Sequence, residues 1–273
     1  MSKPFRFAAQ SAAVEGEAWL ATARRAEELG YASLLMPDGM QLLSSLTALA
    51  MAAGATTALH VGTFVAASPL RPPRLAAWDV HSLSVLSGGR FEFGVGTGLP
   101  EVAEQAVSLL GQPPTTVAQR LAMVGEAVDA LRELDGDHHT PVLIAAGGPK
   151  ARGLAAAKAD IVTIAHGPLI SRDEIARLTA DVREAAGSRA DEIEFASPVF
   201  VVGDEPAPLA LRFLQVEWAT LVAHDSLMIL RGSVQQMADE LERRRETLGI
   251  SYFSVNAMYI EEFAPVVELL AGR

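Results

Sequence analysis

The sequence predicts an α/β fold of the (β/α)8 TIM-barrel type. Short apolar runs alternate with longer amphipathic runs along the chain, and eight of the short runs have the composition of strands. No linker-like tract interrupts this alternation, and 273 residues is an ordinary length for such a barrel. An open doubly wound sheet produces the same alternation, but eight strands in this length favour the closed barrel. We therefore expect one barrel domain over residues 1–273.

The elements of the first half are assigned from apolar runs and their stop signals. Gly30 follows a helical run, at the position where a left-handed C-cap is needed. Residues with high β-propensity mark the third and fourth strands. The expected elements are strand Phe5–Ala9, helix Glu17–Leu29, strand Ser33–Met36, helix Leu43–Ala53, strand Leu59–Ala66, helix Leu75–Leu86 and strand Phe91–Val95.

The second half repeats the same rhythm. Ile175, Leu178 and Val182 recur at helical spacing, and a similar apolar face marks the next long helix. Pro206–His224 is helical in pattern and is expected as an excursion between strands seven and eight. The expected elements are helix Val117–Leu134, strand Val142–Ala146, helix Arg152–Lys158, strand Ile161–Ile164, helix Arg172–Ala186, strand Ile193–Val202, helix Ser233–Leu248, strand Tyr252–Ala257 and helix Glu261–Leu270.

Composition excludes several classes of protein. The net charge of −11 disfavours binding to nucleic acid or to an anionic membrane. Without cysteine there is no disulfide, thiolate chemistry or iron–sulfur cluster. The start, Met1 to Trp19, lacks the order of a signal peptide, and the apolar stretch Leu46 to Ala58 is too short to span a bilayer. We expect a cytoplasmic protein that acts on a small molecule.

The reactive face of a parallel barrel lies at the C-terminal ends of its strands. Small residues dominate these ends. Gly94, Gly96 and Gly98 alternate through the end of the fourth strand. They leave room for a flat ring to approach the backbone, or they form a tight turn that requires glycine. Their spacing and position do not match a dinucleotide-binding fingerprint.

An anion site is predicted after the fifth strand. Gly147 and Gly148 lie between a strand and a helix, where backbone N–H groups attract a phosphate, and Lys150 and Arg152 add positive charge. An ordinary glycine-rich turn has the same pattern.

Other catalytic chemistry has little support in the sequence. His138 and His139 are adjacent in a polar turn, so we predict a solvated loop and no metal site. No Gly-x-Ser-x-Gly elbow occurs.

Several segments resemble the bacterial luciferase-like oxidoreductase family, and most closely its branch that uses the deazaflavin coenzyme F420. Ala23–Asp38 is similar to the family's first helix and second strand, and Leu59–Gly98 to its third strand, helix and fourth strand. The run PVLIAAGGPKARGLAAAKADIVTI is similar to its fifth and sixth strands, and RGSVQQMADELERRRETLGISYFSV to its last repeat.

The resemblance implies a set of cofactor-binding residues. Asp38 would lie against the polar end of the deazaflavin ring, and Phe64–Val65 would form the family's non-prolyl cis peptide behind it. Thr97 and Gly98 would edge the ring. Gly147 and Gly148 would hold the phosphate, with Pro149 and Lys150 beside them.

The sequence also departs from the family pattern. Gly39 and Leu99 stand where relatives carry a histidine and a glutamate with proton-transfer roles. Their absence favours reduction of an activated C=C, C=N or C=O bond over conventional alcohol oxidation. His166, after strand six, joins Asp38 as a candidate catalytic residue, and Tyr259 is a weaker candidate.

Three functions remain open. The first is an F420-dependent oxidoreductase, and the second is an FMN-dependent monooxygenase on the same fold. The third is a barrel that binds cofactor without turnover. The longer acidic tail of F420 requires extra cations, for which Lys150, Arg152, Arg71 and Arg231 are candidates. A homodimer would fit the family.

Overall fold

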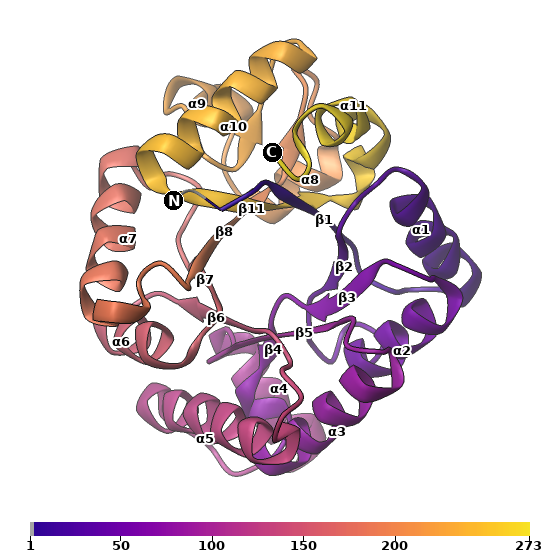
Figure 1. The fold of residues 1–273 in the computed structure, drawn as a ribbon, viewed down its shortest axis with the longest axis vertical. Coiled ribbons are helices and arrows are strands. Elements are labelled where there is room, and N and C mark those ends of the chain that lie inside the picture. The colour runs from indigo at the N-terminus through magenta and orange to yellow at the C-terminus, as the bar shows by residue number, and fades with distance from the viewer. Residues whose placement is uncertain (1–2) are drawn as a thin grey trace.

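The computed structural model describes residues 3–273, and its strands form a closed parallel barrel (Figure 1). Eight strands make the wall, each parallel to its neighbours. The ring closes where β3 pairs with β5, with Val61 opposite Phe91. The wall strands are β1 (Arg6–Gln10), β2 (Ser33–Met36), β3 (His60–Thr63), β5 (Phe91–Gly96), β6 (Val142–Ala146), β7 (Ile161–Ile164), β8 (Glu194–Val199) and β11 (Ile250–Asn256). The predicted fold class is confirmed.

A ring of helices surrounds this wall (Figure 1). Their buried faces follow the apolar spacing in the sequence; in α7, for example, Ile175, Leu178 and Val182 are buried. Capping boxes fix the starts of α5 and α10. The surrounding helices are α1 (Gly16–Glu28), α2 (Ser45–Ala55), α3 (Pro73–Leu86), α5 (Val117–Asp135), α6 (Pro149–Lys158), α7 (Arg172–Ala186), α10 (Val234–Leu248) and α11 (Ile260–Leu270).

Two predicted strands are divided in the structure. The predicted strand Leu59–Ala66 ends at Thr63, and pairing resumes in β4 (Ala66–Ala67) after a cis peptide bond between Phe64 and Val65. The predicted strand Ile193–Val202 separates into β8 and β9 (Val201–Val202), which pairs with β10 (Ile229–Leu230) outside the barrel.

The segments between the regular units carry additional helices. The predicted excursion contains α8 (Pro208–Leu214) and α9 (Trp218–Ala223). Helix α4 (Pro100–Leu110) follows β5 and was not predicted from the sequence. Its buried residues Val102 and Ala106 pack with Ala67 and Leu70, so α4 lies on the β4 side of the barrel mouth.

The glycines of β5 make room for the protein's own backbone. A Cβ at Gly94 would lie 1.9 Å from the Thr63 carbonyl oxygen, and one at Gly96 would lie 3.0 Å from a Val65 methyl carbon. At Gly94 and Gly96 the structure therefore supports neither of the two interpretations, whereas Gly98, with a φ of +71°, lies in a turn that favours glycine. Gly94 and Gly96 leave space for the bulge of residues 63–65. The side chains of Phe64 and Val65 in this bulge pack onto the apolar layer inside the barrel.

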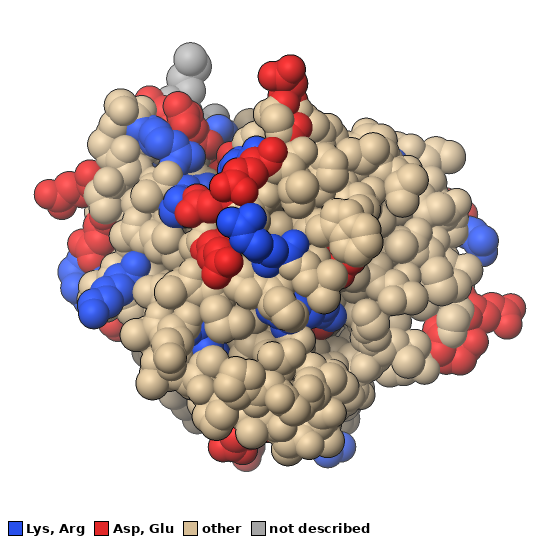
Figure 2. All heavy atoms as spheres, turned by 90° about the horizontal axis from the view of Figure 1, so that it is seen from below, with Lys and Arg blue, Asp and Glu red and all other residues tan. Residues whose placement is uncertain are grey.

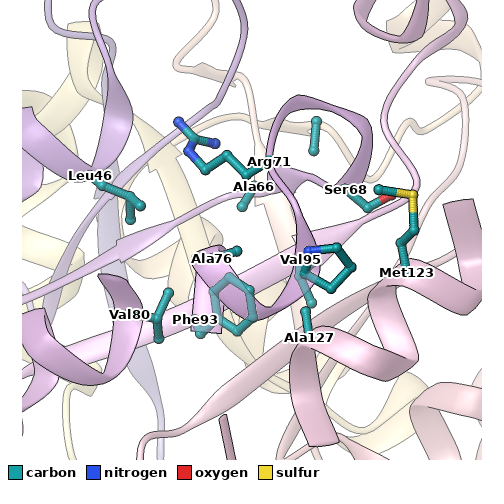
Figure 3. Close-up of a pocket in the computed structure, with 12 residues that line it drawn as sticks. Leu46, Ala66, Ser68, Arg71, Ala76, Val80, Phe93, Val95, Met123 and Ala127 are labelled. Carbon is teal, nitrogen blue, oxygen red and sulfur yellow. The ribbon is translucent and has the colours of Figure 1, made fainter. Parts of the chain in front are cut away.

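A small cavity lies between the barrel wall and the outer helices (Figure 3). Its volume of about 20 Å³ is space for roughly one water molecule. Leu46, Val80, Phe93, Val95 and Met123 line it, with Arg71 at one side. Because it is apolar and very small, we regard it as a packing void and place the functional site elsewhere.

None of the helices formed by residues 3–273 is long and apolar enough to cross a membrane.

Candidate cofactor and substrate site

A central cavity of about 380 Å³ opens at the C-terminal end of the barrel. The Phe64–Val65 bulge forms one wall, and residues of β6, β7, β8 and α8 and of the segments beside β5, β7, β8 and β10 contribute the others. Most of the lining is apolar. The lining residues are Phe64, Val65, Leu99, Ala145, Thr163, Ile164, Ala165, His166, Pro168, Pro198, Phe200, Phe213, Leu214 and Met228.

A second, wider groove of about 620 Å³ lies beside the start of α6. Gly148 is the N-cap of α6 and offers no side-chain cap, so amides of the first turn have no side-chain partner there. Pro149 at the first helical position has no N–H of its own. Gly147, Gly148 and Pro149 line the groove together. This arrangement favours an anion.

Two arginines add positive charge to the groove. Arg152 lines it, and its Nη1 donates to the Gly147 carbonyl oxygen at 2.6 Å. The buried Nε of Arg152 has no hydrogen-bond partner in the protein. Arg177 lines the groove from α7 and is exposed, and its Nη2 lies 3.7 Å from Oε1 of Glu174, which also lines the groove. Arg177 was not among the predicted site residues, although its position in the helix that follows strand six could have indicated it.

The two cavities adjoin at the end of β7. Ala165, His166 and Pro168 line both of them. A ligand with a flat apolar head and an anionic tail would therefore find matching surroundings on the two sides of His166. The residues present fit a flavin or deazaflavin nucleotide, because the apolar cavity suits its ring and the groove suits its anionic tail.

His166 lies where the two cavities meet, and its hydrogen-bond partner determines which ring nitrogen carries the hydrogen. Its Nδ1 lies 2.8 Å from the Gly167 carbonyl oxygen, which can only accept, so Nδ1 carries the hydrogen. Burial lowers the pKa of the His166 imidazole below its usual range, although the Gly167 carbonyl opposes this shift. Near neutral pH the ring is uncharged, and Nε2 offers a lone pair.

Asp38 is held by several protein groups. Ser45 Oγ donates to its Oδ1 at 2.9 Å, and the Ala67 amide donates to its Oδ2 at 3.3 Å. The guanidinium of Arg71 binds both oxygens. The Asp38 side chain is only 3% exposed. Both oxygens are thus engaged within the protein, and the role of Asp38 at a ring stays a prediction.

Thr97 and Gly98 lie at the end of β5, outside the lining of the central cavity. The Thr97 carbonyl oxygen accepts from Arg120 Nε at 2.8 Å. Gly98 has a φ of +71°, and a Cβ there would lie 3.2 Å from the Cβ of Ala67. The two residues fix the turn that leads into α4.

The other predicted cations differ in their positions. Arg71 is paired with Asp38, and Arg231 is paired with Asp204 at 2.7 Å on the excursion. Lys150 is exposed in the first turn of α6 and does not line the groove. Of the four candidates, Arg152 is the one that lines it.

The remaining candidates lie away from both cavities. The Tyr259 hydroxyl accepts from the Ala207 amide at 2.8 Å and holds the start of the excursion. His139 is exposed and lies 3.1 Å from Asp160, whereas His138 is bonded to Ser84. Within residues 3–273, no group of three metal-ligating side chains has the geometry of a metal site.

Comparison with known proteins places this geometry in a family. The sequence model of the luciferase-like monooxygenases matches residues 2–248, which is most of the chain. The chain belongs to the luciferase-like monooxygenase family. The cis peptide between Phe64 and Val65 agrees with the resemblance described above.

The relatives of similar sequence include one protein with a named activity and one without. A 5,10-methylenetetrahydromethanopterin reductase of Methanolobus tindarius is 27% identical over 230 residues, which is 76% of this chain and 68% of the relative. An uncharacterised protein of Mycobacterium tuberculosis is 29% identical over 159 residues, which is 49% of this chain. The match spans 53% of the length of that mycobacterial relative.

Solved structures of luciferase-like enzymes share the whole fold. An F420-dependent secondary alcohol dehydrogenase, solved with an F420–acetone adduct, superimposes with a TM-score of 0.79 at 18% identity, over 98% of this chain and 99% of its own. A riboflavin lyase with modified FMN superimposes with a TM-score of 0.76 at 14% identity, over 98% of this chain and 93% of its own. At these identities the likeness shows the fold, and users of both cofactors occur among its members.

Proposed function

We propose that this luciferase-like protein is an F420-dependent oxidoreductase that reduces an activated C=C, C=N or C=O bond of a small molecule. One observation carries the proposal: an apolar cavity against the Phe64–Val65 bulge adjoins a groove with an uncapped helix start and two arginines. A methylenetetrahydromethanopterin reductase among its relatives, and F420-dependent enzymes among the solved structures that share its fold, support the choice of cofactor.

When bound, reduced F420 supplies the hydride, and the protein supplies position and polarity. The Phe64–Val65 bulge would form the wall behind the ring, as the family resemblance implies. Gly147, Gly148 and Arg152 would hold the anionic tail. His166 holds a proton at Nδ1 and a lone pair at Nε2, so near neutral pH it orients a hydroxyl donor or accepts a proton. In the reductive direction, we propose that water supplies the proton.

A fluorescence titration of the purified protein with F420 and with FMN, side by side, tests this proposal. We expect saturable binding of F420 and weaker binding of FMN. Tighter binding of FMN would overturn the choice of cofactor. Saturable binding of neither compound would overturn the proposed function.

Charge-reversing substitutions test where the anionic tail of F420 binds. We expect Arg152→Glu and Arg177→Glu to weaken F420 binding about tenfold or more, because each replaces a groove cation with an anion. Lys150→Glu should have a smaller effect, since Lys150 lies beside the groove without lining it. Unchanged affinity in the Lys150 variant would remove that residue from the site.

An FMN-dependent monooxygenase is the second candidate, because an FMN-containing lyase shares the fold. A shorter tail held at the start of α6 should depend less on Arg177, which lines the groove from α7. If Arg177→Glu left FMN binding unchanged and FMN bound more tightly than F420, this candidate would replace the first.

A cofactor-binding barrel without turnover is the third candidate, because no carboxylic acid lines the described part of the central cavity. Saturating F420 binding without turnover of electron-poor alkenes, imines and ketones would favour it.

We also propose that the protein forms a homodimer through α2 and α3. Helix α2 carries no charged residue, and its outer face includes Met51. On the adjacent α3, Leu75, Trp78 and Val85 are exposed. Figure 2 views the molecule from the α3–α5 side, where a broad uncharged area adjoins a cluster of charges. Exposed apolar area of this kind is typical of an interface.

A further inference from the structure

We propose that the central cavity takes an uncharged, largely apolar substrate, and that Leu99 and Phe213 at its rim select for it. This inference rests on the proposed function, in which the ring lies against the Phe64–Val65 wall of this cavity and the substrate takes the remaining space towards its rim.

The chemistry of the lining is the first argument. Two polar side chains, those of Thr163 and His166, belong to it, and Thr163 is 5% exposed. Among residues 3–273, no carboxylate, lysine or arginine lines this cavity. A charged substrate would lose its water there without gaining a charged partner. The cavity therefore discriminates against carboxylates and ammonium groups.

The rim is the second argument. Leu99 is 68% exposed and Phe213 is 65% exposed, and both line the cavity. Large apolar side chains left this open at a cavity mouth become covered when an apolar ligand binds. Leu99 is the N-cap of α4, and Phe213 belongs to α8. Both come from segments outside the regular strand–helix units, where a barrel can vary its specificity.

The division of charge between the two cavities is the third argument. Glu174, Arg152 and Arg177 line the groove beside α6, and none of them lines the central cavity. The proposed cofactor tail uses that groove. His166 is uncharged near neutral pH and offers no attraction to an anion at the junction. The central cavity is thus left with apolar contacts and a few hydrogen bonds to hold its ligand.

Matched pairs of neutral and anionic probes test the proposal. Benzylideneacetone and cinnamate share one shape, and oct-3-en-2-one and hept-2-enoate share another; in each pair a methyl ketone replaces a carboxylate. Binding is measured by calorimetry, with the protein as purified and again with oxidised F420 added. We expect each ketone to bind at least about tenfold more tightly than its carboxylate.

Substitutions at the rim make the test specific to the two residues. We expect Leu99→Ala and Phe213→Ala to weaken binding of both ketones about fivefold. Leu109→Ala on α4 and Leu209→Ala on α8 are the matched controls, because Leu109 and Leu209 are exposed but do not line the cavity. They should stay within about twofold of the native protein. Leu99→Lys should raise the affinity for cinnamate, since it adds the missing counter-charge.

The outcomes separate this inference from the proposed function. Carboxylates that bind as tightly as the ketones, or control variants as weak as the rim variants, would overturn the inference even if F420 binds. A ketone preference that depends on Leu99 and Phe213, in a protein that does not bind F420, would support the inference and overturn the proposed function.

Discussion

The backbone of β3 leaves no room for a side chain at position 94 of β5. Gly94 and Gly96 lie in β5, and Gly98 lies in the turn that follows it, as one interpretation of these glycines predicted. The reason for glycine at position 94 was not predicted, because the atom that excludes a side chain there is the carbonyl oxygen of Thr63, thirty-one positions away in the chain. A single sequence carries no record of such a contact.

Gly94→Ala tests this interpretation. A Cβ placed 1.9 Å from a backbone oxygen forces the β3–β4 bulge to move, so we expect a loss of about 3 kcal/mol in the free energy of unfolding. Gly153→Ala in α6 is the control, because a Cβ there meets nothing within 4 Å and alanine favours a helix interior. Urea denaturation measures both. Equal stability of the two variants would mean that the bulge has another conformation in solution.

The contacts of Asp38 could not be predicted from its position in the sequence. Its position after the second strand was predicted, but its partners Ser45 and Arg71 come from the helix and turn that follow. The family resemblance predicts a contact with the cofactor, whereas the geometry shows a residue that joins β2, α2 and β4.

We expect Asp38→Asn to lower the free energy of unfolding by about 2–3 kcal/mol, because it leaves the largely buried Arg71 without its charged partner. Asp204→Asn removes a comparable but exposed pair with Arg231 and should cost less than about 0.5 kcal/mol. Thermal and urea unfolding would measure the two. If Asp38→Asn abolished F420 binding without changing stability, the carboxylate would act on the ligand and not on the scaffold.

At the scale of elements, regular units were predictable and connecting segments were less so. β2, β6 and β7 have the predicted bounds, because each is a short, largely apolar run between clear stop signals. Helix α4 has readable signals in Pro100, Glu101 and the C-cap Gly111, which the sequence analysis did not use. The paired strands β9 and β10 have two residues each, too few to give a periodic pattern.

A cluster of charged side chains links α7, α10 and the segment around β10. Glu240 on α10 binds Arg172 at the start of α7 at 2.7 Å and Arg244 at 2.6 Å. Arg244 is 1% exposed and donates to the carbonyl oxygens of Leu227 and Ile229. The cluster therefore anchors the end of the excursion that carries Phe213.

This cluster predicts an acid-sensitive contribution to stability. Burial would raise the pKa of Glu240, but Arg244, with Arg243 and Arg172, lowers it from 4.5 to about 2. A carboxyl group with a lowered pKa stabilises the folded state above its unfolded pKa, and this contribution is lost as the pH falls from 4.5 towards 2. After an allowance for solvent screening, we expect a contribution of about 2 kcal/mol.

Urea unfolding of the Glu240→Gln variant between pH 7 and pH 2 measures this contribution of Glu240 to stability. The variant should be less stable than the native protein at pH 7, and the difference should shrink as the pH falls. Glu242→Gln, an exposed residue of the same helix, should follow the native curve throughout. A constant difference between Glu240→Gln and the native protein would contradict the lowered pKa.

The whole molecule is an acidic barrel whose charge is unevenly distributed. Two copies with a net charge of −11 each repel one another, so an uncharged part of the surface favours association. Helix α2 supplies such a surface, and the exposed apolar side chains of α3, which lies next to it in the ring (Figure 1), extend it beside Arg74, which pairs with Glu126 and Glu133 of α5. A two-fold axis would bring the same helices of both copies together.

Trp78→Glu should therefore yield a monomer. Trp78 is 60% exposed in the middle of α3, and a pair of like charges at a two-fold interface opposes association. Light scattering with size-exclusion chromatography measures the mass, for which the native protein should give twice 28.9 kDa. Leu209→Glu is the control, because α8 lies across the barrel from α3 (Figure 1) and Leu209 is also exposed. It should remain dimeric, and a native protein with the mass of one chain would contradict the proposed interface directly.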